Sequence, residues 1–219
     1  MGPNLPRPSQ MGTRIARPSE VSVSEVVETA TSNSNTMKPL SMVETVLKQA
    51  GLEREQIECL AIGLGPGSYT GIRVAIALAQ GWQLARRVRL LGLSSVECIA
   101  AQAQADGFTG KACVVIDAQR EEFYMTRYDI GVGECREIFP LRLATLPEVR
   151  ERQNADETLI GPEVTRWFPD GRVIFPRAAT LGRLAMMRGE FVPGEKLEPI
   201  YLRETVFVKA PPPRVLPAG

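Results

Sequence analysis

Histidine does not occur in this sequence of 219 residues, and its absence removes whole classes of chemistry. A catalytic triad built on imidazole needs a histidine, and so does a metal site with imidazole ligands. The four cysteines, Cys59, Cys98, Cys113 and Cys135, are far apart and include no C-x-x-C pair. We therefore expect free structural thiols, no metal, and the reducing environment of the cytoplasm.

The sequence also lacks a large net charge and long apolar runs. The formal net charge is +1 and the pI is about 7.6, so no strong field draws the chain towards nucleic acid or a membrane. No stretch approaches the roughly 18 to 20 apolar residues that a membrane-spanning helix requires. Residues 1–20 are rich in Pro, Arg and Ser without an apolar segment, so we expect a disordered arm there and not a secretory signal.

Extended and helical patterns alternate along the remaining chain, which predicts an α/β fold with helices packed on sheets. In the first half we predict extended segments at 21–29, 57–64 and 90–93, and helices at 36–50, 69–87 and 94–105. In the second half we predict strands at 111–117, 122–128, 134–143, 158–161 and 172–175, and helices from Thr145 and at 178–189. Polar residues 106–110 separate two expected lobes, 21–105 and 106–219.

A glycine loop joins the strand at 57–64 to the helix that follows. Its residues are Gly65, Pro66, Gly67, Ser68, Tyr69, Thr70 and Gly71, followed by Ile72 and Arg73. The spacing is neither G-x-G-x-x-G nor a Walker A loop, and no lysine occurs between Lys48 and Lys111. The loop could still bind a phosphate through its backbone N–H groups. Spacing favours a tight turn, in which Gly67 adopts unusual dihedrals and Ser68 or Thr70 caps the helix.

The same segment, with three ordered stretches around it, resembles the TsaB (YeaZ) family. The family signature G-P-G-S-[FY]-T-G-[LVI]-R is present at residues 65–73, and a G-[VL]-S-[ST] segment follows at 92–95. Residues 116–124 match the family hairpin I-D-A-R-x-G-E-[VI]-Y, with Gln119 and Glu121 in place of Arg and Gly. Residues 199–203 match a late P-x-Y-L-R, so the resemblance extends over about residues 24–213.

The resemblance implies an actin/Hsp70-like fold of two related lobes. Members of the family are partner subunits of TsaD, which transfers threonylcarbamoyl to the tRNA adenosine beside the anticodon, and a small ATPase, TsaE, joins the complex. A chain of this kind is non-catalytic, has no cofactor, and meets tRNA only through the complex. A homodimer is a second arrangement that the resemblance allows.

The sequence departs from the family at its N-terminus. Members open with an apolar strand that leads to an Asp-Thr-Ser or Asp-Thr-Ala turn, whereas the first aspartate here is Asp106. We interpret this as a misassigned start, or as loss or replacement of the opening hairpin, so that the N-terminal strands of the first lobe are missing or altered. Nucleotide binding is less expected as a result, because Mg²⁺ needs carboxylate and phosphate ligands.

The helices at 36–50 and 69–87 carry more apolar residues than one sheet face needs. The resemblance places the TsaD-binding surface on these helices. The candidate interface residues are Leu40, Met42, Val43, Val46, Leu47, Ile72, Ile76, Ala79 and Trp82. A narrow polar stripe also follows the second helix, formed by Arg73, Gln80, Gln83 and Arg87.

The sequence also allows three alternative interpretations. A self-contained nucleotide-binding protein of the actin/Hsp70 class would have to bind ATP alone. A glycoprotease-like peptidase would need an activated serine or cysteine, and no general base for one is visible. A decayed copy would have lost its fold together with its first strands.

Overall fold

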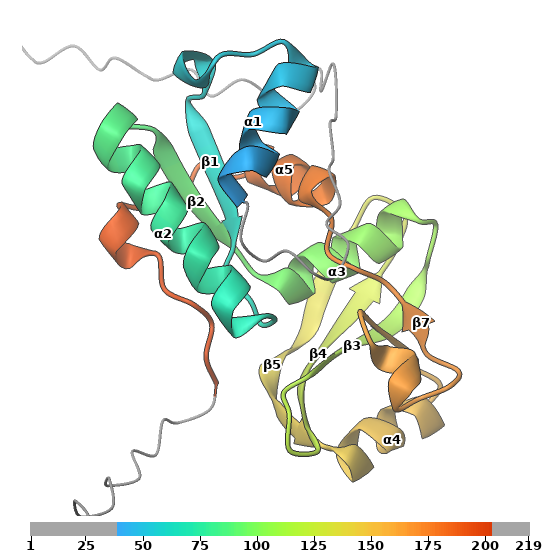
Figure 1. Ribbon diagram of the computed structural model, residues 1–219. Coiled ribbons are helices and arrows are strands. Elements are labelled where there is room, and N and C mark those ends of the chain that lie inside the picture. The colour runs from blue at the N-terminus through green and yellow to red at the C-terminus, as the bar shows by residue number, and fades with distance from the viewer. Residues whose placement is uncertain (1–38, 203–219) are drawn as a thin grey trace, which may run out of the picture.

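The computed structural model describes residues 39–202, which form two sheets with helices around and between them (Figure 1). The predicted arm at 1–20, the predicted strand at 21–29 and the residues after Leu202 lie outside the described residues. The helices are α1 (Pro39–Ala50), α2 (Tyr69–Arg86), α3 (Ser95–Ala105), α4 (Leu146–Asn154) and α5 (Ala178–Met186). The strands are β1 (Cys59–Gly63), β2 (Arg89–Leu93), β3 (Gly110–Asp117), β4 (Glu122–Ile130), β5 (Cys135–Thr145), β6 (Thr158–Gly161) and β7 (Arg172–Val173).

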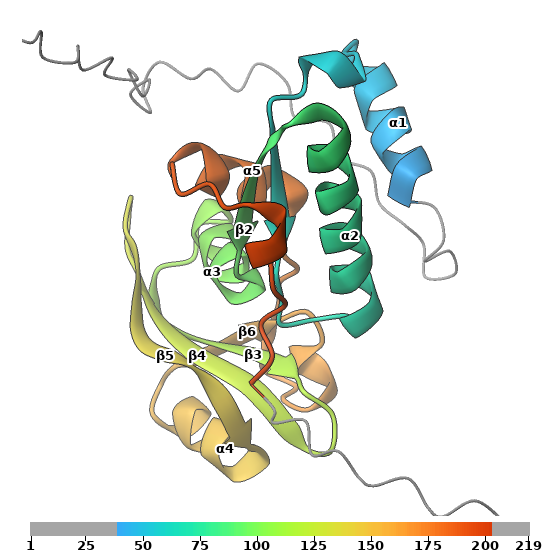
Figure 2. The ribbon, with the colours of Figure 1, turned by 90° about the vertical axis from the view of Figure 1, so that its left-hand side faces the viewer.

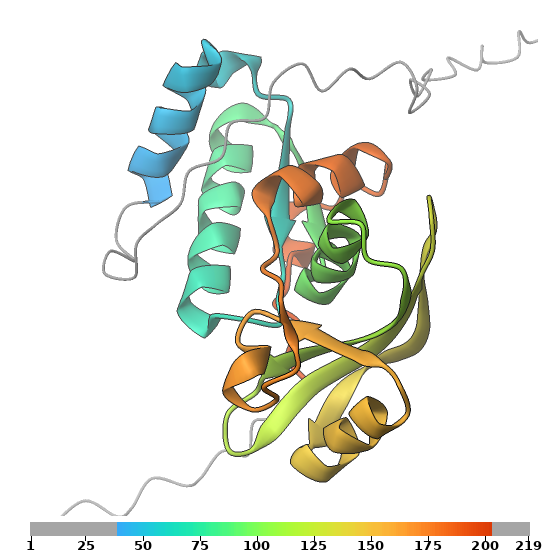
Figure 3. The ribbon, with the colours of Figure 1, turned by 90° about the vertical axis from the view of Figure 1, so that its right-hand side faces the viewer.

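The first sheet consists of β1 and β2, which pair in parallel from Cys59 and Arg89 to Gly63 and Leu93. Helix α2 covers one face, with α1 beside it, and α5 covers the other face (Figures 2 and 3). Both strands are apolar because a parallel sheet is buried on both of its faces. The buried residues of this core are Ile62, Ile72, Ile76, Ala79, Val88, Leu90 and Leu197.

The second sheet has the order β5-β4-β3-β6-β7. Strands β3 and β4 form the hairpin expected from the sequence, and β6 returns parallel to β3 after α4. Helix α3 packs on one face of this sheet and α4 on the other, with an apolar cluster under each. The hairpin turn holds Gln119, Arg120 and Glu121 at φ of 65°, 59° and 61°, a conformation that side-chain-bearing residues seldom adopt.

Two helices pack on the sheet of the other predicted lobe. Helix α3 belongs to the predicted first lobe but packs on the second sheet, and α5 belongs to the predicted second lobe but packs on the first. The reason is the small first sheet, whose two apolar faces need cover that α2 alone does not provide. Helix α5 also ends at Met186, earlier than the predicted residue 189, and β7 ends at Val173. No helix within residues 39–202 is long and apolar enough to cross a membrane.

Candidate docking groove and signature loop

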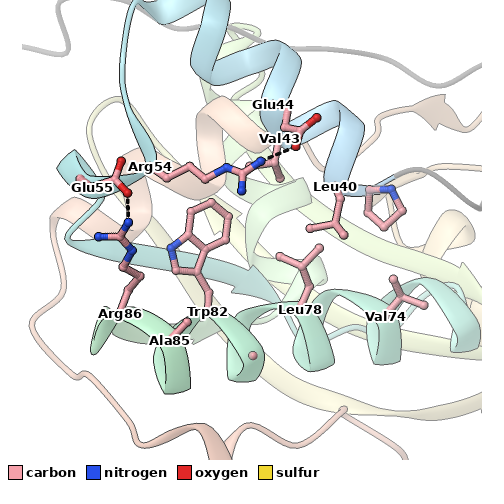
Figure 4. A pocket seen from close by; sticks show the side chains of 12 residues that line it. Leu40, Val43, Glu44, Arg54, Glu55, Val74, Leu78, Trp82, Ala85 and Arg86 are labelled. Carbon is pink, nitrogen blue, oxygen red and sulfur yellow. Dashed lines mark hydrogen bonds and ion pairs between the residues drawn. The ribbon is translucent and has the colours of Figure 1, made fainter.

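Helices α1 and α2 enclose an apolar groove of about 550 Å³ (Figure 4). Leu40 and Val43 enter it from α1, and Val74, Leu78 and Trp82 enter it from α2. Leu40 keeps 63% of its surface exposed and Val74 keeps 36%. Apolar side chains on two neighbouring helices are therefore left uncovered by the described part of the chain.

Two ion pairs border the groove near Trp82 (Figure 4). Arg54 pairs with Glu44 of α1, and Arg86 of α2 pairs with Glu55. Exposed pairs of this kind contribute only about 0 to 1 kcal/mol to stability. Their effect here is to neutralise the charged border, so the groove presents an apolar floor without net charge.

Gly81 lies within α2 at the groove, and the packing of the described chain gives no reason for a glycine there. A Cβ atom built at this position meets nothing within 4 Å. A glycine inside a helix costs roughly 0.5 to 1 kcal/mol relative to alanine. The missing side chain instead lets another backbone approach α2 closely at this point.

The structure separates the nine predicted interface residues into two groups. Leu40, Val43 and Trp82 line the groove, as a docking surface requires. The others are buried in the chain's own core or lie outside the groove lining: Leu47, Ile72, Ile76 and Ala79 are buried, and Met42 and Val46 are half-buried. The three α2 residues Ile72, Ile76 and Ala79 are buried because this side of α2 covers the first sheet, so they cannot contact a partner, and Leu47 of α1 is buried as well. Met42 and Val46 stay predictions.

The groove residues that the sequence analysis missed are Val74, Leu78, Gly81 and Ala85 of α2. They recur at the spacing of one helix face, opposite the buried residues. That periodicity was visible in the sequence. It could not decide which of two apolar faces the sheet covers.

The signature loop is a tight turn stabilised by bonds within the chain. The Ser68 hydroxyl accepts a hydrogen bond from the N–H of Gly71 at 3.2 Å, which confirms the predicted cap of α2. The Gly65 carbonyl accepts one from the N–H of Ser95 at 2.7 Å, so the loop connects the starts of α2 and α3. Gly65 has φ of 96°, and a Cβ there would lie 2.8 Å from Ile72.

The polar stripe of α2 binds another part of the same chain. Residues 190–202, here named the strap, return to α2 after α5 (Figure 2). Gln80 and Gln83 both bond the backbone of Gly194, and Arg73 donates from Nε to the Tyr201 hydroxyl at 3.1 Å. Arg87 has a different role, as the C-terminal cap of α2 at φ of 54°.

A second cavity, a cleft of about 510 Å³, lies between the two layers. The signature loop residues Pro66 to Ser68 line it, together with Ser95, Phe175 and the β3–β4 turn. Its charged lining residues are both acids, Asp117 and Glu163. The lining residues within 39–202 include no lysine or arginine, so they offer a phosphate group no direct cationic contact.

Three of the four cysteines show no activation for nucleophilic chemistry. None of the four forms a disulfide within residues 39–202. Burial raises the pKa of Cys113 to about 12 and that of Cys135 to about 11. It also raises the pKa of Cys59. A nucleophilic cysteine needs a lowered pKa, so these three thiols do not suit a peptidase.

Metal ligands are also dispersed in the part of the chain that the structure describes. Within residues 39–202, no three His, Cys, Asp or Glu side chains come together in a way that could hold a metal ion. The groove is accordingly the feature best suited to function, and it suits binding of a protein surface.

The sequence matches the model of a known protein family. The family model for TsaD, tRNA N6-adenosine threonylcarbamoyltransferase, matches residues 27–188. The chain belongs to this family. Within it, the chain resembles the TsaB (YeaZ) members, as the signature at residues 65–73 indicates.

Two curated relatives carry the same name, tRNA threonylcarbamoyladenosine biosynthesis protein TsaB. The protein from Escherichia coli K12 is 29% identical over 195 residues, which cover 81% of this chain and 84% of the relative. The protein from Haemophilus influenzae is 28% identical over 204 residues, covering 83% and 85%. The chain is therefore a TsaB (YeaZ) family member over most of its length.

Solved structures show the same fold. YeaZ from Pseudomonas aeruginosa superposes with a TM-score of 0.63 at 26% identity, covering 75% of this chain and 84% of that one. A second Pseudomonas aeruginosa structure, described as an uncharacterized protein with similarity to peptidase YeaZ, gives a TM-score of 0.64 at 28% identity, covering 75% and 82%. These likenesses confirm the predicted actin/Hsp70-like fold class.

Proposed function

We propose that this chain is a non-catalytic partner subunit in the biosynthesis of tRNA threonylcarbamoyladenosine, and that it binds a TsaD-like catalytic subunit through the α1–α2 groove. The observation that carries the proposal is the apolar groove, which residues 39–202 leave uncovered and which has Gly81 in its wall. Two TsaB relatives are named for this pathway, and the family model is that of the transferase itself.

The chemistry of the groove supports a helical partner. Apolar side chains at helical spacing on two adjacent helices suit a third helix laid along them. Stable complexes bury about 1,600 Å² in total, so the groove would be the centre of a larger surface. The bordering ion pairs stay at the solvent-exposed rim of such an interface.

The absence of catalysis in our proposal rests on the side chains present. The sequence has no histidine, and burial raises the pKa values of three cysteines. In the proposed complex the TsaD-like subunit performs the transfer, a TsaE-like ATPase joins it, and tRNA reaches this chain only through the assembly. A complex of this kind acts in the cytoplasm, where free thiols persist.

The proposal is tested by charge substitution on the groove. Leu40→Glu places a carboxylate on an exposed floor residue of α1 and should weaken binding to the TsaD-like subunit at least tenfold, measured by calorimetry. The matched control is Leu84→Glu, because Leu84 is on α2, outside the groove lining, and 88% exposed.

Equal affinity of Leu40→Glu and wild type would disprove docking at the groove. Binding of the wild-type chain to itself, with no binding to the TsaD-like subunit, would replace the heterodimer by a homodimer. Threonylcarbamoyl transfer by the isolated chain would refute its non-catalytic role.

A further inference from the structure

The strap is attached to α2 and the first sheet at three places. Near its start, Val192 forms a bridge with Leu90 of β2, donating its N–H at 2.9 Å. In the middle, Gly194 is buried against α2. Near its end, the N–H of Ile200 donates to the Leu64 carbonyl at 2.8 Å. Buried Leu197 adds apolar contact with the core of the first sheet.

The middle attachment depends on two glutamines of α2. Gln80 Nε2 donates to the Gly194 carbonyl at 2.8 Å, and the Gly194 N–H donates to Gln83 Oε1 at 2.8 Å. A Cβ at position 194 would itself lie 2.8 Å from Gln83 Oε1. Gln83 thus satisfies the N–H of Gly194, which would be costly to leave unbonded in this buried place. The Gly194 carbonyl also accepts from the N–H of Leu197 at 3.0 Å, so Gln80 adds a second bond that fixes the strap to α2.

The last attachment uses two residues of the signature. The Arg73 guanidinium lies 4.2 Å from the centroid of the Tyr69 ring. The rings of Tyr69 and Tyr201 lie 5.6 Å apart. Together with the bond from Arg73 to the Tyr201 hydroxyl, these contacts hold the end of the described chain on the first turns of α2.

The strap and the groove meet on one turn of helix. Gln80 and Gln83 face the strap, whereas Gly81 and Trp82, between them in sequence, line the groove. A rotation or shift of α2 therefore moves both surfaces together. Because a helix is stiff over one turn, a change in the hold of the strap is transmitted to the wall of the groove.

We infer that the strap sets the position of α2 for docking, with Gln80 and Gln83 as its positioning residues. This inference rests on the proposed function, because the docking partner is the TsaD-like subunit. Coupling between two sites is reciprocal. Loosening the strap should weaken docking, and docking should tighten the strap, although no strap residue lines the groove.

The first experiment compares two glutamine variants of the full chain. Gln80→Ala with Gln83→Ala removes the bonds to Gly194, and we expect the Kd for the TsaD-like subunit to rise about 5- to 150-fold, the usual range of allosteric coupling. The control is Gln104→Ala, which removes bonds of 2.7 and 2.8 Å to the Gly131 and Glu134 carbonyls, far from α2. It should leave the Kd within about twofold.

The second experiment measures hydrogen exchange of the strap in the wild-type chain. Addition of the TsaD-like subunit should slow exchange of the Val192, Gly194 and Ile200 amides. Partner binding also slows exchange of every amide that exchanges through opening of the folded chain. The inference therefore requires the strap amides to slow more than the amides of β1 and β2, whereas a strap that only stabilised the fold would slow by the same factor as those strands. Unchanged exchange on binding would overturn the inference, and so would an unchanged Kd in a double variant whose strap amides exchange faster.

The outcomes also distinguish this inference from the proposed function. If the wild-type chain does not bind the TsaD-like subunit, or if Leu40→Glu binds normally, docking at the groove itself fails. If the double variant does not fold, the single variants Gln80→Ala and Gln83→Ala replace it, and either raises the Kd if the inference holds.

Discussion

A side chain at position 81 should affect the stability of the chain and its affinity for a partner in opposite directions. Alanine at this position should stabilise α2 by roughly 0.5 to 1 kcal/mol, because a Cβ there meets nothing and glycine is a poor helix former. The same methyl group should keep a partner helix from close approach. We predict that Gly81→Ala raises Tm by about 1 to 4 °C and weakens binding to the TsaD-like subunit.

Gly182 of α5 provides the control for this prediction. It is also a helical glycine whose added Cβ meets nothing within 4 Å, but it lies outside the groove. Gly182→Ala should raise Tm by a similar amount, seen by thermal unfolding, and leave binding unchanged. If Gly81→Ala binds as well as Gly182→Ala does, glycine at position 81 has no part in docking.

A small group of hydrogen bonds stabilises the start of helix α4. The Glu148 carboxylate accepts from the backbone N–H of Thr145 at 2.7 Å, from its hydroxyl at 2.8 Å, and from Arg142 at 2.8 Å. The Thr145 bonds, ahead of Arg142, lower the pKa of Glu148 to about 2 from an ordinary 4.5. A lower pKa in the folded state means that the ionised carboxylate stabilises the fold.

The pH dependence of stability follows from this sign. The contribution of Glu148 is fully present above pH 4.5 and is lost as the pH falls towards about 2. Glu148→Gln keeps a side chain that can complete the capping box but removes the charge, so it should lower the free energy of unfolding by about 0.3 to 1 kcal/mol at pH 7. Urea unfolding at pH 7 and at pH 2.5 should show this difference shrink, and a constant difference would contradict the assignment. Glu151→Gln, on the exposed side of the same helix, is the control.

Most elements were predictable from local signals, and α2 shows where such signals stop. Its start at Tyr69 follows from Ser68 as a cap, and the hairpin of β3 and β4 follows from the apolar runs on both sides of its turn. Apolar residues occupy two faces of α2, however, and only the tertiary structure shows that Ile76 meets the sheet while Leu78 lines the groove. The polar stripe was visible, but its partner lies 114 residues away at Gly194.

On the scale of the whole molecule, the path of the chain depends on contacts distant in sequence. A composition change near residue 106 suggested two consecutive lobes. Instead, α5 and the strap, from the end of the described chain, pack on the small first sheet, and α3 packs on the second sheet. No local pattern carries that information, because it follows from the need to cover both faces of a two-stranded sheet.

This arrangement predicts two parts of unequal stability. The first half is here the first sheet with α2, α5 and the strap, and the second half is the second sheet with α3 and α4. Within the described residues, the first sheet has two strands over one apolar cluster, whereas the second has five strands with clusters on both faces. Small sheets with little buried apolar surface open at lower free energy. We therefore expect the first half to open in less urea than the second.

Two native cysteines can report the difference. Cys59 is on β1, and Cys113 is fully buried on β3, where its raised pKa keeps it unreactive until the strand opens. Because Cys59 is half-buried and can react without opening, its labelling rate is divided by the rate in the absence of urea. Read by peptide mass spectrometry, this ratio should rise at lower urea than the labelling of Cys113. A ligand that binds only the folded first half raises its opening free energy by mass action. A saturating concentration of the TsaD-like subunit should therefore shift the labelling of Cys59 to higher urea and shift that of Cys113 less. Labelling of both thiols at the same urea concentration would show that the two halves unfold as one unit.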